Sequence, residues 1–355
     1  MFCSIAMVAL LGGCGAGDKG VGSDALAAVG AQQAEAGSAA ESGIRSFRDW
    51  RTACDNGGDC FAFTGGSSGA FVRILMSAGP EADPQVVIGV SGREDAEQFE
   101  ISIDAGTHRL EATPRSGWAG IAEARGDQAR DLITAMSTGR DMTLTVDGES
   151  GPLSLAGASA ALLWIDERQG RLDTVTALLR RGDRPASAVP TSAPLPAIRP
   201  RPASISQFSE DRHPPLPDSV AARSEITACR EGWGDPGSFE DDVRYAELGP
   251  STRLWAVPCF RAAYNTGHIL FLTDHLGETV RPVTLPGFDP TDDVLLNVEI
   301  GRTVTHSVRN RGLGDCGLFQ QWRWGQRGFE LALEKRMDDC WGMPPEMWPT
   351  LWRTQ

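Results

Sequence analysis

Cysteines are the residues of this sequence whose type and spacing most invite a chemical interpretation. The chain contains eight, at positions 3, 14, 54, 60, 229, 259, 316 and 340. A cysteine can accept a lipid, attack a substrate, bind a metal ion or close a disulfide. The first two lie in or directly after a short apolar stretch, and the other six are spread over the rest of the chain, so the two groups are interpreted separately.

Cys14 follows the apolar stretch Phe2–Leu11, within the residues Leu-Gly-Gly-Cys. This stretch is too short to cross a bilayer as a helix, which needs about 20 residues, but it suits the hydrophobic part of an export signal. The four residues resemble the bacterial lipobox, in which small residues fit the signal peptidase cleft and the cysteine takes a diacylglycerol group. We therefore predict a lipoprotein signal peptide at residues 1–13 and lipidation of Cys14.

The residues around the signal leave one alternative open and indicate a location. A chance cysteine in an ordinary cleaved signal is the alternative. Met1–Ala6 contains no Lys or Arg, which departs from the basic start of such signals and points to a start of translation farther upstream. Gly15 stands where, by resemblance to the sorting rule of enteric bacteria, an Asp would hold a lipoprotein in the inner membrane. We expect an outer-membrane lipoprotein, on the periplasmic side or at the cell surface, anchored by acyl chains that contribute about 0.8 kcal/mol per buried CH₂.

The six remaining cysteines predict three disulfides, because an even number of cysteines in an exported protein typically pairs. Other pairings stay open, because connectivity cannot be deduced from sequence. The two cysteines of CDNGGDC are too close for much else, and the short loop they close is worth about 2 kcal/mol in the chain-entropy model. The simplest pairs are Cys54 with Cys60, Cys229 with Cys259, and Cys316 with Cys340.

The same cysteines are poor candidates for metal binding or catalysis. Five residues separate Cys54 from Cys60, unlike a redox CxxC, and no second pair stands at the spacing of a zinc ribbon. His306 could act as a base for a Cys316 nucleophile, but a cysteine in a disulfide has no thiolate for attack. We therefore predict no metal, no cofactor and no catalytic cysteine.

Motifs of the common hydrolases and nucleotide-binding enzymes are not found. The sequence has no G-x-S-x-G, H-E-x-x-H or G-x-x-x-x-G-K-[ST]. Adjacent aspartates occur at 241–242, 292–293 and 338–339, but neighbouring residues on a strand point to opposite faces and do not meet one substrate. The segment FDPTDDVLLNVE lacks the spacing of an EF-hand loop, which makes calcium a weak candidate. We assign no catalytic residue.

Composition indicates an exported protein built from several parts. A chain of 355 residues exceeds one comfortable core and predicts two domains. The net charge of -14 argues against nucleic acid as a partner. Residues 14–44, rich in Gly, Ala and Ser, predict a flexible tether that spans about 30 Å. Residues 183–224 are proline-rich and predict an extended linker, with a partner-binding motif as the alternative.

β-rich patterns stand on both sides of this linker. Within residues 45–182, the short runs FVRILM, QVVIGV and FEISID predict strands, and two helical patterns end at Gly139 and Gly170. We expect an antiparallel, β-sandwich-like domain with packed helices. Within residues 225–355, QQWRWGQRGFELAL predicts a hairpin turning at residues 325–328, in a second, smaller, disulfide-braced β-rich domain. The predicted fold class is mainly β, of the α+β type.

Tryptophan is concentrated in the second predicted domain, which contains seven of the ten. Trp322 and Trp324 share a strand face if the hairpin is correct, because side chains alternate along a strand. Exposed, the pair would form a binding platform for sugar rings of peptidoglycan or for a protein partner. Buried, it would fill the core of a small domain, which is the interpretation we favour for most of these tryptophans.

Several segments together resemble a known family. They are FRDWRTACDNGGDC, LITAMSTGRDMTLTV and LSLAGASAALLWIDERQGR, followed by VPCFRAAYN, RGLGDCG, RWGQRGFELAL, MDDCWG and WPTLWRT. With them the chain resembles the proteobacterial envelope family named domain of unknown function 1176, and its N-terminal half is more distantly similar to the invasion-associated locus B family. The resemblance implies an exported protein of unsettled activity and supplies no catalytic residue. Ala263 departs from the glycine pattern expected near RAAYN, so no tight glycine turn is inferred there.

Two functions from different classes remain. The first is a non-catalytic, lipid-anchored binding or scaffolding protein of the cell envelope, with an envelope protein or peptidoglycan as partner. The second is an envelope hydrolase acting on cell-wall glycan through Asp315, Asp338 or Asp339, which would need two carboxylates with separated pKa values in one cleft. We favour the first, because it accounts for the anchor, the linkers and the disulfides without an unusual residue.

Overall fold

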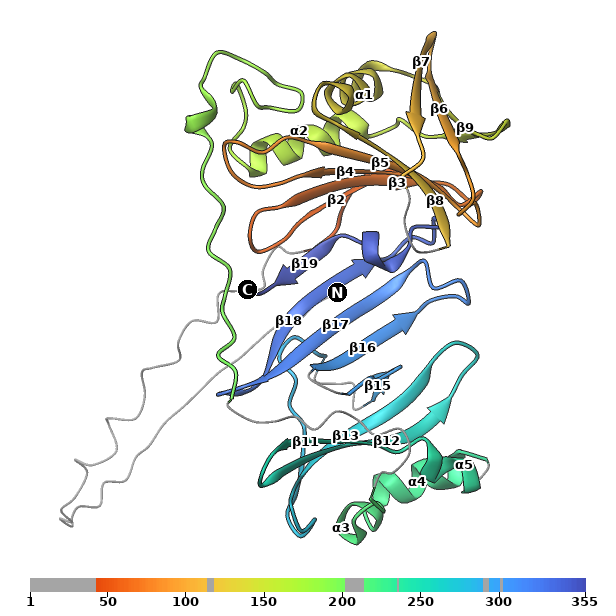
Figure 1. The fold of residues 1–355 in the computed structure, drawn as a ribbon, viewed down its shortest axis with the longest axis vertical. Coiled ribbons are helices and arrows are strands. Elements are labelled where there is room, and N and C mark those ends of the chain that lie inside the picture. The colour runs from red at the N-terminus through yellow and green to blue at the C-terminus, as the bar shows by residue number, and fades with distance from the viewer. Residues whose placement is uncertain (1–42, 114–117, 202–213, 235, 290–293, 301–302) are drawn as a thin grey trace, which may run out of the picture. The chain divides into compact units, whose positions relative to one another are not determined.

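The computed structural model describes residues 43–113, 118–201, 214–234, 236–289, 294–300 and 303–355. The predicted signal peptide, Cys14, most of the predicted tether and the aspartates at 292–293 lie outside these ranges. Residues Glu41–Gln355 form one compact unit. The fold is mainly β, as predicted, and its sheets are antiparallel (Figure 1).

The first half contains two sheets in which most paired strands are also close in sequence. The six-stranded sheet has the order β1 (Arg45–Phe47), β2 (Trp50–Cys54), β3 (Cys60–Gly65), β4 (Ala70–Met76), β5 (Gln85–Ser91) and β8 (Ala119–Arg125). The four-stranded sheet has the order β10 (Glu149–Leu153), β9 (Met142–Val146), β6 (Gln98–Ile103) and β7 (Gly106–Glu111). Such local pairing keeps connections short.

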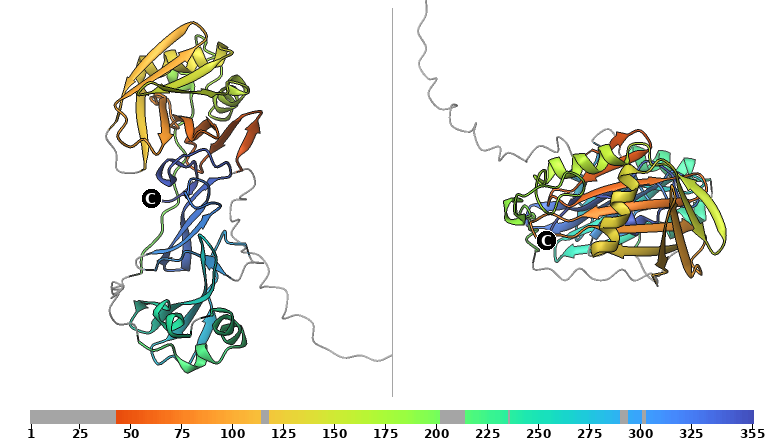
Figure 2. Two further views of the ribbon diagram at one scale, coloured as in Figure 1. Left: turned by 90° about the vertical axis from the view of Figure 1, so that its right-hand side faces the viewer. Right: turned by 90° about the horizontal axis from the view of Figure 1, so that it is seen from above.

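Two helices, α1 (Gly126–Thr138) and α2 (Ala158–Arg168), cover one face of the six-stranded sheet (Figure 2). Helix α1 ends at Gly139, as predicted, where a Cβ would lie 2.5 Å from Cγ2 of Ile103. Its buried residues have the spacing of one helical face and join the apolar side chains of the strands in the main core. They are Ala129, Leu132, Ile133 and Met136.

The second half begins with short helices and continues with two further sheets. The helices are α3 (Asp218–Ala221), α4 (Ser224–Gly232) and α5 (Pro236–Asp241), and the single turns η1 (Ala186–Ala188) and η2 (Pro345–Met347) are 3₁₀ helices. The five-stranded sheet contains β11 (Arg244–Gly249), β12 (Thr252–Arg261), β13 (Thr266–Asp274), β14 (Val280–Pro282) and β15 (Leu295–Leu296). The last sheet has the order β16 (Thr303–Arg309), β17 (Gly317–Gly325), β18 (Gly328–Met337) and β19 (Thr350–Arg353).

The predicted hairpin is the pair β17 and β18, in which Gly325 faces Gly328. One hydrophobic cluster joins the five-stranded sheet to the last sheet and includes Leu254, Leu270 and Trp322. A second cluster packs helices α3, α4 and α5 against the other face of the five-stranded sheet. The sequence patterns alone did not predict these three short helices.

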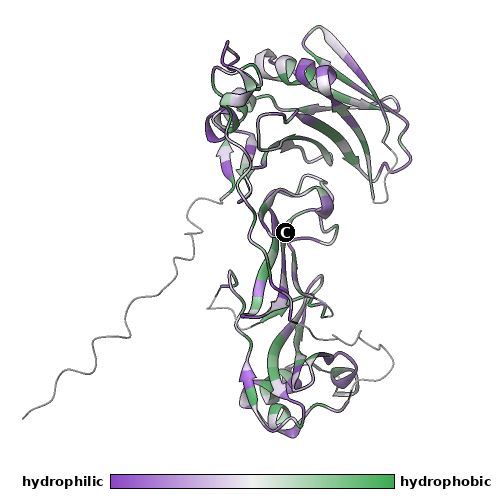
Figure 3. Cartoon of the chain, turned by 60° about the vertical axis from the view of Figure 1, so that its left-hand side comes forward, coloured by the Kyte–Doolittle hydropathy of each residue, from purple (hydrophilic) through white to green (hydrophobic). Residues whose placement is uncertain are grey.

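A further cluster joins the first half to the C-terminal segment. Phe63 of β3 and Phe71 of β4 pack with Met343, Met347 and Trp348, which lie between β18 and β19. Hydrophobic residues follow the strands, and many of the connecting loops are hydrophilic (Figure 3). The beginning and the end of the described chain therefore share one hydrophobic cluster.

Residues 189–201 of the proline-rich segment form a strap that is docked on the protein. Near its start, Ala193 N–H donates to the carbonyl of Gly57 at 3.3 Å. Farther along, the carbonyl of Pro196 accepts from the Gln355 N–H at 3.0 Å, and the carbonyl of Arg199 accepts from Gln326 N–H at 3.1 Å. Proline lacks an N–H but keeps its carbonyl, so this segment serves mainly as an acceptor.

The loop between β2 and β3 is closed by the Cys54–Cys60 disulfide. Inside it, Oδ1 of Asp55 accepts hydrogen bonds from the N–H groups of Gly57 at 2.8 Å and Asp59 at 2.9 Å. Burial raises the pKa of Asp55, and the neighbouring Arg353 opposes this rise. The buried Asp55 carboxylate of this loop is therefore held by backbone N–H groups and is stabilised by a neighbouring positive charge.

Arg353 of β19 supplies that cation. Its Nε lies 2.5 Å from Oδ2 of Asp55, and its Nη2 lies 2.7 Å from Oδ2 of Asp59. The side chain of Asn56 also exchanges two hydrogen bonds of 2.9 Å with the backbone of Arg353, as a neighbouring strand would. The last strand is thereby attached to the first disulfide loop.

We predict that Arg353→Ala lowers the free energy of unfolding by about 2 kcal/mol, because it leaves the buried Asp55 without its cation. Urea denaturation followed by tryptophan fluorescence measures the change. Arg336→Ala is the matched control, since its pair with Asp338 is exposed, and it should cost less than about 1 kcal/mol. Equal losses in the two variants would contradict the role of Arg353.

Candidate functional site

A groove of about 750 Å³ lies between the first half of the fold and the segment that connects β18 to β19. We call it the Trp341 groove. Its walls combine charged side chains, one indole and the backbone of a glycine turn. The lining residues are Asp49, Arg51, Gly65, Gly66, Arg140, Asp141, Met142, Thr143, Pro152, Leu153, Ser154, Leu155, Ala156, Asp339 and Trp341.

Segments that carry the family resemblance converge on this groove, although they lie far apart in the sequence. FRDWRTACDNGGDC contributes Asp49 and Arg51, LITAMSTGRDMTLTV contributes Arg140–Thr143, LSLAGASAALLWIDERQGR contributes Leu153–Ala156, and MDDCWG contributes Asp339 and Trp341. Hydrogen bonds and packing between distant segments, and not one local motif, therefore create the groove.

Arg51 links the sheet to the C-terminal segment. Its Nε lies 2.9 Å from Oδ2 of Asp339, and its Nη2 lies 3.3 Å from Oδ1, a two-point contact. The guanidinium also stacks over the ring of Trp341, with Cζ 5.3 Å from the ring centroid. Its Nη1 donates to the carbonyl of Arg48 at 2.9 Å. One cation therefore fixes both the carboxylate and the indole of the groove.

Glycines allow the Trp341 segment to approach the sheet. A Cβ on Gly65 would lie 2.4 Å from Cβ of Trp341. Gly342 has a φ of +82°, and a Cβ there would lie 2.5 Å from the carbonyl oxygen of Gly69. Phe63 meets the Trp341 ring edge to face, with centroids 6.3 Å apart. These contacts leave little freedom for the position of the indole.

Asp315 fixes the backbone next to Trp341. Its carboxylate is fully buried and accepts hydrogen bonds from Nε of Arg311 and from the N–H of Gly342, both at 2.6 Å. Burial raises the pKa of Asp315, but the hydrogen bonds from Arg311 and Gly342 outweigh it and leave the pKa below its ordinary value. The carboxylate is therefore ionised at neutral pH and acts as a structural anion.

Asp49 and Ser154 form another part of the groove wall. Oγ of Ser154 donates to Oδ2 of Asp49 at 2.6 Å. The N–H of Asp49 donates to the carbonyl of Ala156 at 3.1 Å, and Nε1 of Trp50 donates to the carbonyl of Ser154 at 2.9 Å. The exposed Asp49 carboxylate is thus held by the Ser154 hydroxyl, and the backbone of Asp49 is held by Ala156.

Several polar groups of the groove remain open to a ligand. Nε1 of Trp341 is not buried and donates to no acceptor within the described ranges. The side chains of Arg140 and Asp141 are exposed and form no ion pair with a described residue. Three carboxylates and two guanidinium groups line the groove. The groove therefore contains both donors and acceptors, and its charges do not produce a strong electrostatic field of one sign.

The three disulfides present in the structure are Cys54–Cys60, Cys229–Cys259 and Cys316–Cys340. They are the simplest pairs named from the sequence. The second ties α4 to β12, and the third ties the residue before β17 to the segment after β18, next to the Trp341 groove. Their sulfurs are bonded to each other and are not available as thiolates.

Asp315, Cys316 and Cys340 place three potential metal-ligand atoms within 4.8 Å of one another. The two sulfurs form a disulfide, and the carboxylate is held by Arg311. A metal ion would have to break both arrangements, because thiolates and free carboxylates are the forms that bind metals. These residues therefore do not fit a metal ion.

The structure contradicts the exposed platform considered for Trp322 and Trp324. Trp322 is fully buried, and its Nε1 donates to the carbonyl of Pro286 at 2.8 Å. Trp324 is partly buried between the ring of Phe329 at 4.8 Å and the guanidinium of Arg201 at 5.1 Å. Both side chains face the core shared with the five-stranded sheet, because a small sheet needs large side chains to exclude water from that core.

The carboxylates of the hydrolase hypothesis occupy different surroundings. Asp315 is buried, Asp338 is exposed, and only Asp339 lines the Trp341 groove. Each is neutralised by an arginine, and the pairs are Asp315–Arg311, Asp338–Arg336 and Asp339–Arg51. This arrangement does not bring two of these carboxylates to one substrate.

His306 does not face a free thiol. Its Nδ1 accepts a hydrogen bond from the N–H of Leu296 at 2.8 Å, and its ring lies 5.3 Å from that of Phe288, edge to face. Cys316 is in a disulfide with Cys340. The cysteine and histidine pair considered from the sequence is therefore not a catalytic dyad.

Apart from Asp339, the residues of the Trp341 groove were not singled out from the sequence. A weak signal was a repeated dipeptide, since Arg-Asp occurs at 48–49 in FRDWR, at 130–131 in QARDL and at 140–141 in STGRD, and residues of the first and third line the groove. In the sequence, each of these dipeptides looks like a pair of ordinary solvent-exposed surface residues. Only the contact of Asp49 and Asp141 with the same groove gives them a common meaning.

These features define a disulfide-stabilised, mainly β protein with a polar groove between segments that are distant in sequence. The model of the family described as "Protein of unknown function (DUF1176)" matches residues 44–355, and the chain belongs to this family. The uncharacterized protein YpfG of Escherichia coli (strain K12) is 30% identical over 339 residues, which cover 88% of this chain and 93% of the relative.

One solved structure adds a weaker likeness. The crystal structure of invasion associated protein b from Bartonella henselae has 14% sequence identity and a TM-score of 0.30, over 36% of this chain and 99% of that chain. Disulfides are typical of exported proteins. None of the helices in the described ranges has the length and hydropathy of a membrane-spanning segment.

We predict that Asp315→Asn lowers the free energy of unfolding by about 2 kcal/mol near neutral pH, because a hydrogen bond to a charged group is worth about 1.5–3 kcal/mol. The folded protein lowers the pKa of Asp315 below 3.8. Its stabilisation is therefore present above about pH 4 and is lost as the pH falls through the folded pKa.

Urea denaturation at about pH 7 and about pH 3 tests this dependence. The difference between wild type and Asp315→Asn should shrink at the lower pH. Asp338→Asn, at an exposed ion pair, serves as the control and should show little difference at either pH. A deficit of Asp315→Asn that is independent of pH would show that the charge of Asp315 is not what stabilises the segment.

Proposed function

We propose that this protein is an exported, lipid-anchored binding module of the bacterial envelope, which holds a segment of cell-wall glycan in the Trp341 groove without cleaving it. The observation that carries the proposal is the composition of the groove. Within about 750 Å³ it combines an accessible indole N–H with negatively charged carboxylates and positively charged guanidinium groups.

A glycan matches this lining chemically. Each sugar hydroxyl both donates and accepts a hydrogen bond, so it can use neighbouring carboxylates and guanidinium groups at the same time. The open donors are Arg140 and the indole of Trp341, and the open acceptors are Asp49 and Asp141. A highly charged polymer would face repulsion from one of the two signs, whereas an uncharged polyol faces none.

The contacts of Asp339 favour a binding role over hydrolysis. This is the one carboxylate of the hydrolase hypothesis that lines the groove, and it is held at two points by Arg51. A general acid must reach the leaving group, whereas both carboxylate oxygens of Asp339 are engaged by the guanidinium of Arg51. The Arg51–Asp339 pair suits a fixed binding wall.

The envelope location rests on two kinds of support. Three disulfides are typical of a protein that matures in an oxidising compartment. The residues Leu-Gly-Gly-Cys before and at Cys14 resemble a lipobox and lie outside the described residues. A lipid anchor followed by a Gly- and Ser-rich tether would place the groove within reach of the cell wall.

We predict that the detergent-extracted full chain binds purified peptidoglycan sacculi and that Trp341→Ala weakens this binding about tenfold, because the variant loses the indole and its N–H. Co-sedimentation over a range of sacculus concentrations measures the affinity. Trp341→Phe should give an intermediate affinity, since it keeps an aromatic ring but not the N–H.

Trp164→Ala is the matched control for loss of a partly buried tryptophan outside the groove, and it should bind like wild type once both variants are shown to be folded by circular dichroism. Release of soluble glycan fragments during the assay would favour a hydrolase. Wild-type affinity in Trp341→Ala, or no binding by the wild-type chain, would refute the proposed site.

We predict that protein extracted from native membranes carries a diacylglycerol group on Cys14 and has no free thiol among its six later cysteines. Non-reducing peptide mass spectrometry reads both features in one experiment. Cys14→Ala should leave the protein in the soluble fraction, because the acyl chains supply the membrane affinity. An unmodified Cys14 in an otherwise intact chain would contradict the anchor, without bearing on the groove.

A further inference from the structure

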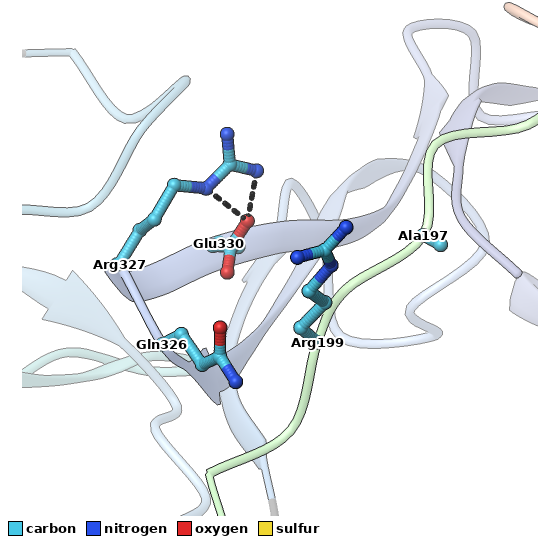
Figure 4. Close-up of a pocket in the computed structure, with 5 residues that line it drawn as sticks. All are labelled: Ala197, Arg199, Gln326, Arg327 and Glu330. Atoms are coloured by element: carbon cyan, nitrogen blue, oxygen red, sulfur yellow. Dashed lines mark hydrogen bonds and ion pairs between the residues drawn. The ribbon is translucent and has the colours of Figure 1, made fainter.

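A second pocket, of about 340 Å³, lies between the strap and the turn of the β17–β18 hairpin. We call it the strap pocket, and it is separate from the Trp341 groove. Ala197 and Arg199 line it from the strap, and Gln326, Arg327 and Glu330 line it from the hairpin (Figure 4). Four of its five lining residues are polar, and two of these are arginines.

The backbone of the strap is fixed where it passes this pocket. Gln326 N–H donates to the carbonyl of Arg199 at 3.1 Å, and Pro200 pairs with Gly325 in an antiparallel bridge. Gly325 allows this approach, since a Cβ there would lie 3.1 Å from Cγ2 of Ile198 and 2.2 Å from Oε1 of Glu330. The turn of the hairpin thus holds the strap backbone at Arg199 in place, while the Arg199 side chain projects into the pocket (Figure 4).

The charges in and around the strap pocket do not balance. Arg327 is paired with Glu330, with its Nε 3.0 Å from Oε2. Arg201 stacks on Trp324 and donates to the carbonyl of Gln326 at 3.1 Å. The guanidinium of Arg199 forms no ion pair or hydrogen bond with any residue in the described ranges. Among the described residues around the pocket, three guanidinium groups therefore stand against one carboxylate, on a chain whose net charge is -14.

We propose that the strap pocket binds a compact oxyanion, a phosphate or a carboxylate group, through the guanidinium of Arg199. Guanidinium is the side-chain group best matched to such anions, because its donors form a planar fork. Gln326 and Arg327 line the same pocket (Figure 4), and both side chains carry N–H donors. Arg327 already neutralises Glu330, so the charge of Arg199 is the surplus one.

The size of the strap pocket limits the ligand to one small group. A volume of about 340 Å³ is near the lower end for small-molecule sites. Such an anion can come from a free metabolite or from the headgroup of an anionic phospholipid, and the chemistry of recognition is the same for both. A long acidic polymer is excluded by the charge of the rest of the chain.

Isothermal titration of the full chain with inorganic phosphate and with acetate tests the site. We expect saturable binding of at least one of these anions, and Arg199→Gln should weaken it about tenfold, the value of one charge-assisted hydrogen bond. Arg281→Gln, which removes an exposed arginine of β14, is the matched control and should bind like wild type.

Glu330→Gln provides a test with the opposite sign. It removes the carboxylate that competes for Arg327, so anion affinity should rise several-fold if the surplus charge is what binds. A purely structural role of these residues would not tighten binding.

Flotation with phosphatidylglycerol vesicles, using Cys14→Ala to remove the anchor, then separates the two sources of the anion, a lipid headgroup and a soluble molecule. Flotation that depends on Arg199 indicates a lipid headgroup, and its absence together with phosphate or acetate binding indicates a soluble anion.

No saturable anion binding by the wild-type chain would overturn the proposal, and so would equal affinities in wild type and Arg199→Gln. Neither result bears on the Trp341 groove, because the two sites share no lining residue. Thermal unfolding of both variants confirms that a change in affinity does not reflect a change in folding.

Discussion

The contact between Arg353 and the disulfide-closed loop at residues 54–60 is the constraint on which the rest of this structure depends. It joins the last strand to the second one through two ion pairs and two hydrogen bonds to Asn56. The other partner of β19 is β18, so Arg353 fixes the far end of the segment between these two strands, whereas Arg51 and the Cys316–Cys340 disulfide fix its beginning. Asp339 and Trp341 belong to that segment. The loop near the start of the described chain therefore anchors the strand that follows the groove residues near its end.

Three arginines have different roles in this protein, and the surroundings of each guanidinium and of its partner explain the difference. Arg311 faces a fully buried carboxylate and has a structural role, because an unpaired buried charge is costly. Arg51 is partly exposed and forms the wall of the Trp341 groove while it holds Asp339. Arg199 is exposed and lacks a partner in the described structure, which leaves its donors free for an anion. The two proposed binding sites differ for the same reason, since one contains balanced charges and the other a surplus of positive charge.

Local patterns predicted the elements that depend on local interactions. The hairpin at β17 and β18 follows from alternation around a glycine turn, and the end of α1 at Gly139 follows from the helical spacing before it. The short helices α3, α4 and α5 were missed, because a few residues give too little periodicity and their stability comes from packing on the five-stranded sheet. The proline-rich segment was expected to be a spacer. Its docking depends on carbonyl groups that accept from distant N–H groups, and composition cannot reveal those partners.

The sequence by itself determined that this chain is mainly β, that it resembles one family of unknown function and which cysteine pairs are simplest, because these properties depend on residue type, short spacing and whole motifs. Only the tertiary structure decided which tryptophan borders a cavity. Trp322 and Trp324 share a strand face, but that face packs against a second sheet. Trp341 follows a disulfide cysteine and would pass for a core residue, yet Arg51, Gly65 and Asp315 hold its segment at the edge of a groove. Exposure is decided by what packs against a residue, and the groups that pack against these tryptophans come from segments far away in the chain.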